Sequence, residues 1–329
     1  MKKLIYWAVG LAAVLAAGSC QKEINYLAGD TAVCFEVSAG DIATKAIADG
    51  TNIDVLYWEL YGADPANASG PLGEGIVRQK NANGDFVVNL TLIADQSYNI
   101  IFWAQVDGKD HYVVDDLRNV VIKTYADEYA NDESRAAFYK VYSFETENGK
   151  AISGTVELTR PFAQLNLGAT TYETSLNQVN NGQIVVNSTA VKITGIANSF
   201  NTIANLKDET VEPGAGETTD GFDKVAVFAA AATPNGNRDK TEQLLTVNSK
   251  DYYWLGMNYL IVDSNVTVEM TLNTNMGVVN HRIDDVPVEK NFRTNILGDM
   301  LTTGAQFVVE VDPDFLEDDQ FAGNEFDIN

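Results

Sequence analysis

The sequence predicts an all-β protein, because apolar and polar residues alternate in several segments that turn residues separate. The clearest alternating segments are residues 86–92, 266–272 and 307–311. Alternation with a period of two is typical of half-buried strands in antiparallel sheets. Asn-Gly pairs, which tolerate the positive φ of tight hairpins, occur at 83–84, 148–149, 181–182 and 235–236. Long amphipathic periods typical of helices are few, so we expect sheets with short connections.

Three segments depart from simple alternation. Residues 53–61 (IDVLYWELY) are apolar on both faces, which predicts a strand in the middle of a sheet. Short helices are expected over residues 131–139 and 171–179. The first of them starts with capping residues and has acids in its first turn.

The N-terminus has the pattern of a bacterial lipoprotein signal. Two lysines precede an apolar run over 4–17, and small residues lead into Cys20. This is a positive region, an apolar region and a cleavage site, and a cysteine at that position accepts diacylglycerol. The run is short for a bilayer span, which takes about 20 residues. We expect residues 1–19 to be removed and residues 20–30 to form a tether lipidated on Cys20. The alternative is an ordinary secretory signal with an incidental cysteine.

Composition limits the possible partners. The formal net charge is −24 at pH 7, and loss of the two signal lysines makes the remaining chain more acidic still. This surplus of acids disfavours nucleic acid and anionic lipid headgroups. The chain has two cysteines. If Cys20 carries a lipid, Cys34 has no disulfide partner, so we expect Cys34 to be a packed thiol inside a strand.

The chain divides near the polar turn at 148–150. Two strand-rich segments of similar size, residues 31–149 and 150–312, are expected to form one β-sandwich domain each. Residues 313–329 are rich in acids, which predicts a solvated acidic tail. The acids around 312–319 would suit calcium, but the EF-hand spacing and its glycine are missing. We therefore expect no metal site.

Two segments resemble a known family. Residues 160–167 (RPFAQLNL) look like the strand that opens the second domain in fimbrillin-like lipoproteins of Bacteroidota. Residues 291–302 (NFRTNILGDMLT) resemble the late N-[FY]-R-T-N-I-x-G-x-L-L-T segment of the same family, the type V pilin superfamily. Together with the lipoprotein signal, VLYW at 55–58 and FWAQ at 102–105, these segments follow the usual order of the family. The resemblance implies two tandem transthyretin-like antiparallel β-sandwiches.

The resemblance also implies a mode of action. Pilins of this family are exported as lipoproteins and cleaved after their first strand, and a strand from the next subunit then fills the groove. Here the first strand would be residues 32–37, with Val33, Phe35 and Val37 facing the core. The loop over 38–51 has Lys45 and no arginine, whereas polymerising members offer arginine to their protease. Either another protease acts there, or the first strand stays in place and the protein remains lipid-anchored.

No motif supports catalysis. The chain has two histidines, His111 and His281, and each is expected to be solvated at a strand end. The HExxH, GxSxG and P-loop patterns are absent from the sequence. The pairs at 115–116 and 284–285 are adjacent acids, which point to opposite faces when they lie in a strand. We expect neither enzymatic activity nor a cofactor.

The sequence therefore predicts a structural or adhesive lipoprotein, anchored in the outer membrane and exposed at the surface. Its role would be that of a fimbrial anchor, accessory or uncleaved surface subunit that works by strand complementation or through its loops. Expected partners are other fimbrillin-type subunits, host proteins or glycans. The alternative is a glycan-binding surface lipoprotein, in which aromatic residues such as those at 252–254 stack on sugar rings.

Overall fold

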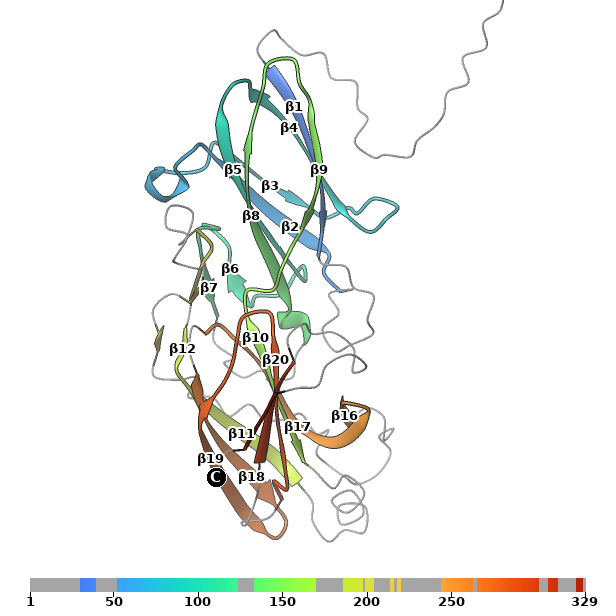
Figure 1. The fold of residues 1–329 in the computed structure, drawn as a ribbon, viewed down its shortest axis with the longest axis vertical. Coiled ribbons are helices and arrows are strands. Elements are labelled where there is room, and N and C mark those ends of the chain that lie inside the picture. Colours follow the sequence, from blue (N-terminus) through green and yellow to red (C-terminus); the bar gives the residue numbers. More distant parts are fainter. Residues whose placement is uncertain are drawn as a thin grey trace, which may run out of the picture.

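The described part of the chain is built from strands. The computed structural model describes residues 30–39, 52–123, 133–169, 186–197, 199–203, 214–215, 218–219, 244–262, 265–301, 307–312 and 324–327. Within them, the only helices are two 3-10 turns, η1 (Pro65–Asn67) and η2 (Glu133–Arg135). Figure 1 shows two groups of sheets along the long axis of the molecule, with a smaller layer between them. The all-β prediction is confirmed.

The first sandwich packs a three-stranded sheet, in the order β4-β1-β9, against a four-stranded sheet, in the order β3-β2-β5-β8. The strands of the first sheet are β4 (Phe86–Ile93), β1 (Asp30–Ser38) and β9 (Ile152–Glu157). Those of the second are β3 (Gly73–Val77), β2 (Val55–Tyr61), β5 (Ser97–Gln105) and β8 (Ala137–Glu145). Phe35, Leu56, Phe86, Phe102 and Phe138 are buried between the sheets. This apolar core holds the sandwich together.

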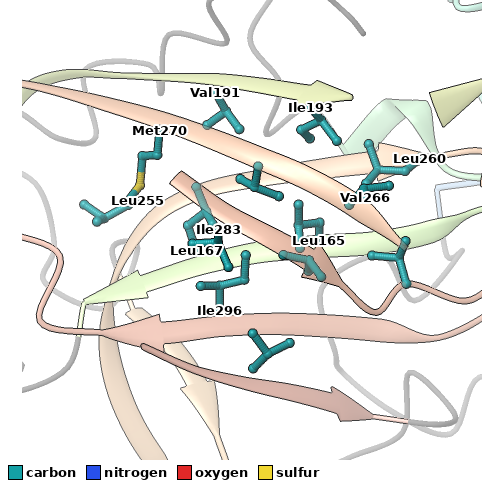
Figure 2. Packing of buried hydrophobic residues seen from close by; sticks show 14 of the residues in the cluster. Leu165, Leu167, Val191, Ile193, Leu255, Leu260, Val266, Met270, Ile283 and Ile296 are labelled. Atoms are coloured by element: carbon teal, nitrogen blue, oxygen red, sulfur yellow. The ribbon is translucent and has the colours of Figure 1, made fainter. Parts of the chain in front are cut away.

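The second sandwich packs a six-stranded sheet, in the order β16-β17-β10-β20-β21-β22, against the sheet β11-β18-β19. The first sheet contains β16 (Leu244–Val247), β17 (Lys250–Leu260), β10 (Ala163–Ala169), β20 (Arg293–Gly298), β21 (Phe307–Asp312) and β22 (Asn324–Asp327). The second contains β11 (Val186–Thr194), β18 (Val266–Thr274) and β19 (Gly277–Val286). Figure 2 shows side chains such as Leu165, Val266 and Ile296 pointing into the space between these layers.

A middle layer joins the two sandwiches. It is the sheet β14-β13-β7-β6, formed by β14 (Gly214–Ala215), β13 (Ser199–Asn201), β7 (Asn119–Ile122) and β6 (Tyr112–Val113). A separate small pair joins β12 (Ile196–Ala197) to β15 (Thr218–Thr219). Phe200 of β13 packs edge-on against Tyr139 of the first sandwich, with ring centroids 4.6 Å apart, and both rings are buried. The two halves of the chain therefore share a hydrophobic cluster.

Several predicted elements are present, and one is shorter than expected. Residues 53–61 contain β2, which lies between β3 and β5 as expected for a central strand. The short helix expected over 131–139 is present only in part: in the described residues 133–139 the η2 turn ends at Arg135 and β8 begins at Ala137. Along 136–139 the side chains go alternately into the first-sandwich core and the middle cluster. Burial on both faces outweighs the local capping signal there. The helix expected over 171–179 lies outside the described residues.

Two strand pairings lie close to the expected boundaries. β9 pairs in parallel with β1, so residues 152–157 belong to the first sandwich although the sequence places the boundary near 149. The division into two folding domains stays a prediction. In the acidic tail, β22 pairs antiparallel with β21, so residues 324–327 extend a sheet.

Cys34 also differs from its expected state. It is buried in β1 and disulfide-bonded, so the expectation of a packed thiol is wrong.

The two segments that carry the family resemblance lie side by side. β10 and β20 pair in parallel, with Gln164 opposite Arg293 and Asn166 opposite Asn295. Arg293 Nε donates to Gln164 Oε1 at 3.0 Å, and Asn166 Nδ2 donates to Asn295 Oδ1 at 2.9 Å. All four side chains are buried. Buried polar groups are costly unless they are hydrogen-bonded, so these contacts specify the register of the two strands.

We expect this register pair to show energetic coupling. Asn166→Ala and Asn295→Ala should each lower the free energy of unfolding by about 1–3 kcal/mol, because each leaves a buried amide unpaired. The double variant should cost less than the sum of the two by about 0.5–3 kcal/mol. Urea unfolding measures all three values. Asn280→Ala, which removes a similar but exposed contact with Thr271, is the control and should change stability by less than about 0.5 kcal/mol. Strict additivity of the two buried changes would contradict this assignment.

Candidate functional site

The candidate site is the first strand, β1, together with the groove that it fills. β1 is the middle strand of its sheet: it pairs antiparallel with β4 along residues 30–37 and parallel with β9 along residues 33–38. Contacts at both ends hold it in register. Thr31 Oγ1 donates to the carbonyl of Glu147 at 2.9 Å, and the N–H of Leu158 donates to the carbonyl of Ser38 at 2.9 Å.

One face of β1 is an apolar row. Val33, Phe35 and Val37 are at most 2% exposed and lie in the core of the first sandwich. The ring of Phe35 is approached edge-on by Tyr142 and Phe144 of β8, at centroid distances of 5.3 and 5.2 Å. Edge-to-face pairs of this kind add stability beyond the buried area itself. The expected orientation of the three residues is therefore confirmed, whereas their role as a removable strand stays a prediction.

The energetics show what loss of β1 would expose. Each of the three buried side chains contributes roughly 1.5–3 kcal/mol by leaving water. Removing the strand would uncover an apolar trough and leave β4 and β9 each with an unpaired edge. A sheet edge beside an apolar trough is the arrangement that accepts an added strand. The rest of the first sandwich thus forms a groove into which the strand β1 fits.

Other predicted site residues are not brought together by the described structure. Cys20 and Lys45 lie outside the described residues, as does most of the loop over 38–51. Tyr142 and Phe144, the aromatic residues of β8 that pack against Phe35, were not identified from the sequence. Both residues alternate with polar residues along β8, and this sequence pattern could have identified them.

The histidines do not support a catalytic site. The expectation that His111 is solvated is wrong, because it is 3% exposed and its Nε2 lies 2.9 Å from Ser134 Oγ. His281 is half-buried, and its Nε2 lies 2.8 Å from the carbonyl oxygen of Met300. Both imidazoles thus serve local hydrogen bonding between neighbouring segments.

A buried carboxylate lies on the opposite face of the same sandwich. Glu59 of β2 is 5% exposed, and its Oε2 accepts hydrogen bonds from Tyr61 Oη at 2.6 Å and from the N–H of Leu117 at 3.0 Å. Burial raises the pKa of Glu59, and these two hydrogen bonds oppose that shift in part. Burial and the adjacent Glu59 also raise the pKa of Tyr61. Sequence reasoning missed this network, because Glu59 lies within an otherwise apolar strand.

Comparison with known proteins places the chain in a family. A family model described as a family of unknown function, DUF6562, matches residues 41–329. The chain belongs to this family. No curated protein matches the DUF6562 chain by sequence.

Solved structures with a similar arrangement are distant in sequence. A fimbrial assembly protein from Parabacteroides distasonis is 13% identical, with a TM-score of 0.44 over 86% of this chain and 96% of that one. The fimbrial anchor protein Mfa2 from Porphyromonas gingivalis is 10% identical, with a TM-score of 0.45 over 86% and 97%. A suggested polysaccharide-binding protein from Bacteroides thetaiotaomicron is 12% identical, with a TM-score of 0.49 over 85% and 95%. At these values the function of the DUF6562 chain has to be argued from its own residues.

Two further features were sought across the described residues of the DUF6562 chain. No helix there has the length and apolar character that a bilayer span requires. No group of three or more His, Cys, Asp or Glu side chains there is placed to hold a metal ion. The acids at 313–319 that would suit calcium lie outside the described residues.

We expect Phe35 to dominate the stability of β1 in its groove. Phe35→Ala should lower the free energy of unfolding by about 3–5 kcal/mol, because it removes a fully buried ring and leaves a cavity. Thr91→Ala is the matched control on the neighbouring strand, since Thr91 is exposed, and should change stability by less than about 0.5 kcal/mol. Urea unfolding measures both. Equal effects of the two substitutions would show that β1 contributes little to the core.

The raised pKa of Glu59 predicts a pH dependence of stability. The folded protein holds this proton more tightly than the unfolded chain, so the resulting stabilisation is present at low pH and is lost as the pH rises. Between pH ~4, near the ordinary Glu pKa, and pH ~7, the wild type should therefore lose stability relative to Glu59→Gln. Thermal unfolding at several pH values measures this difference.

Tyr61→Phe provides the second arm of this test. It keeps the ring but removes a hydrogen bond that favours the Glu59 carboxylate. The loss of stability with rising pH should then be steeper than in the wild type. A difference between wild type and Glu59→Gln that stays constant over the whole range would contradict the assignment.

Proposed function

We propose that the protein is a non-enzymatic, lipid-anchored cell-envelope protein of the fimbrillin type that acts by β-strand complementation. The observation that carries this proposal is the position of β1, inserted between β4 and β9 with Val33, Phe35 and Val37 in the core. A strand so placed is either a permanent part of its own sandwich or a removable plug. Both roles rest on the same chemistry, which is backbone pairing plus an apolar row.

The sequence favours a retained first strand. The loop after β1 has Lys45 and lacks arginine, although the polymerising relatives implied by the resemblance are cut at arginine. Retention of β1 would make the protein an anchor, an accessory subunit or a free surface lipoprotein. It would then offer its loops and sheet edges, and not an open groove, to its partners.

The glycan-binding alternative gains no support from the aromatic segment that suggested it. Tyr252 is buried and packs with Leu245, Val247 and Leu297, so its ring is not presented to a ligand. The side chains of residues 253 and 254 are outside the described part. The buried position of Tyr252 fits the core packing of the second sandwich.

Strand exchange tests the role of β1 directly. A specific protease site placed at residues 43–48 of the full chain permits cleavage after β1, and mild denaturant then releases the strand. We expect the emptied protein to melt at a clearly lower temperature and to recover on addition of a synthetic peptide of residues 30–38. The apolar row and the paired edges provide the free energy of rebinding.

A matched peptide provides the control for this exchange. The same peptide with Phe35→Asp places a charge in the apolar trough and should neither bind nor restore the melting temperature. Unchanged melting after release of β1, or equal rebinding by both peptides, would overturn the proposal.

The anchor requires its own test, because a lipid on Cys20 competes with the disulfide at Cys34. The chain has two cysteines, so Cys20 cannot carry a thioether-linked lipid and also be the disulfide partner of Cys34. We expect the intact mass of the protein from cell envelopes to show a lipid on Cys20 with residues 30–38 retained, a form in which Cys34 is a thiol and not the disulfide of the structure. Cys20→Ser should then leave the membrane fraction, whereas Cys34→Ser should stay in it. A mature chain without lipid would refute the anchor.

A further inference from the structure

A pocket lies on the outer face of the sheet β3-β2-β5-β8, away from the β1 groove. It has a volume of about 420 Å³, which is within the range of ~300–1,000 Å³ typical of small-ligand sites. Its wall is formed by β2, β3 and the segment that leads from β6 to β7. The lining residues are Tyr57, Trp58, Glu59, Glu74, Gly75, Ile76, Val114, Asp115 and Leu117.

Two cross-strand pairs form the floor of the pocket. Tyr57 is opposite Ile76 and Glu59 is opposite Glu74 in the pairing of β2 with β3. In an antiparallel pair, the Cβ atoms of directly opposite residues lie about 4.5–5.5 Å apart, and like charges at such positions are destabilising. Glu74 accordingly contributes to the raised pKa of Glu59. A positive group between the two carboxylates would remove this repulsion.

Glu59 also has an oxygen available to a ligand. Among the described residues, both hydrogen bonds to its carboxylate end on Oε2, from Tyr61 and Leu117. Glu59 is 5% exposed and lines the pocket, and no donor from the described residues contacts its Oε1. A buried acceptor of this kind gains most from a donor that carries charge.

The nearby arginines do not supply that donor. Arg118 Nη2 contacts Asp116 Oδ2 at 2.7 Å, and its Nη1 donates to the carbonyl of Ala68 at 2.7 Å. Arg78 Nε contacts Asp107 Oδ2 at 2.6 Å. Both guanidinium groups are thus engaged outside the pocket, and no basic side chain is among the residues that line it.

The shape of the site selects an organic cation over a metal ion. Glu59, Glu74 and Asp115 are not clustered as a metal site within the described residues. The pocket walls also carry Tyr57, Val114, Leu117 and Ile76, of which Ile76 is half-exposed at 52%. An aromatic ring and aliphatic walls suit an alkyl stem and a cation–π contact. A metal ion would use neither.

We propose that this pocket binds an ammonium or guanidinium group on an alkyl stem, such as a lysine or arginine side chain of a partner protein. The charged head lies between Glu59 and Glu74, with Oε1 of Glu59 as its principal acceptor. The stem lies against Tyr57 and Ile76. This proposal does not depend on lipidation or on strand exchange.

Calorimetric titration of the full chain tests the proposal. The probes are Nα-acetyl-lysine N-methylamide, agmatine, and the neutral analogue Nα-acetyl-norleucine N-methylamide. We expect saturable binding of the two cations, and at least about tenfold weaker binding of the neutral analogue, because it lacks the charge-assisted hydrogen bond. Cadaverine separates the sources, since tighter binding of this diamine than of the lysine derivative indicates a free amine as the ligand.

Three variants complete the test. Glu59→Gln should weaken binding of the lysine derivative at least about tenfold. Glu74→Gln, on the edge strand β3, should weaken it by a smaller factor and also serves if Glu59→Gln fails to fold. Glu157→Gln is the matched control, because Glu157 is exposed on β9 and outside the pocket; it should leave binding unchanged.

Four results would overturn the proposal. They are no saturation by either cation at about 10 mM, equal binding of the neutral analogue, unchanged affinity in both pocket variants, and binding of calcium or neutral sugars in place of the cations.

Discussion

The insertion of β1 between β4 and β9 is the constraint on which the first sandwich depends. β1 provides the central backbone pairing of its sheet and places Phe35 among the rings of β8. Because β9 pairs with β1 in parallel, a strand from the middle of the chain joins this sheet through β1. Without β1, the strands β4 and β9 would not be joined in one sheet. Local contacts along the chain do not provide this pairing, so the sandwich depends on a contact of long sequence separation.

β2 links the two faces on which the functional proposals rest. Leu56 and Leu60 lie in the core that contains β1, whereas Tyr61 lies in the cluster shared with the second sandwich. Even- and odd-numbered residues of β2 therefore point into different layers. Burial on both faces requires an almost wholly apolar strand, and Glu59 is the exception. The free-energy cost of burying Glu59 is reduced because Tyr61 and Leu117 donate hydrogen bonds to one of its carboxylate oxygens.

The sequence was informative where burial follows a simple period. Phe86 and Val88 of β4 alternate with more exposed residues, and β18 alternates from Val266 to Asn273. It was misleading at 131–139, where capping residues precede a strand buried on both faces. The boundary near 149 marks a true turn, with Gly149 at φ +74°, but a turn does not show which sheet the next strand joins. Long-range partners also determine the network around Glu59: the N–H of Leu117 donates to Glu59 across 58 positions, and no local pattern encodes that contact.

In the proposed function, strand pairing and charge would contribute to recognition in different ways. Backbone pairing fixes register and provides affinity, yet it discriminates poorly, because every extended segment offers the same N–H and C=O groups. A formal net charge of −24 attracts basic partners at long range and repels acidic ones, so it acts mainly on encounter rates and on the exclusion of wrong partners. An acidic pocket beside the exposed edge strand β3 would turn that general attraction into a choice among basic side chains. Specificity would then come from the buried Glu59 and the exposed Glu74, and affinity from backbone pairing.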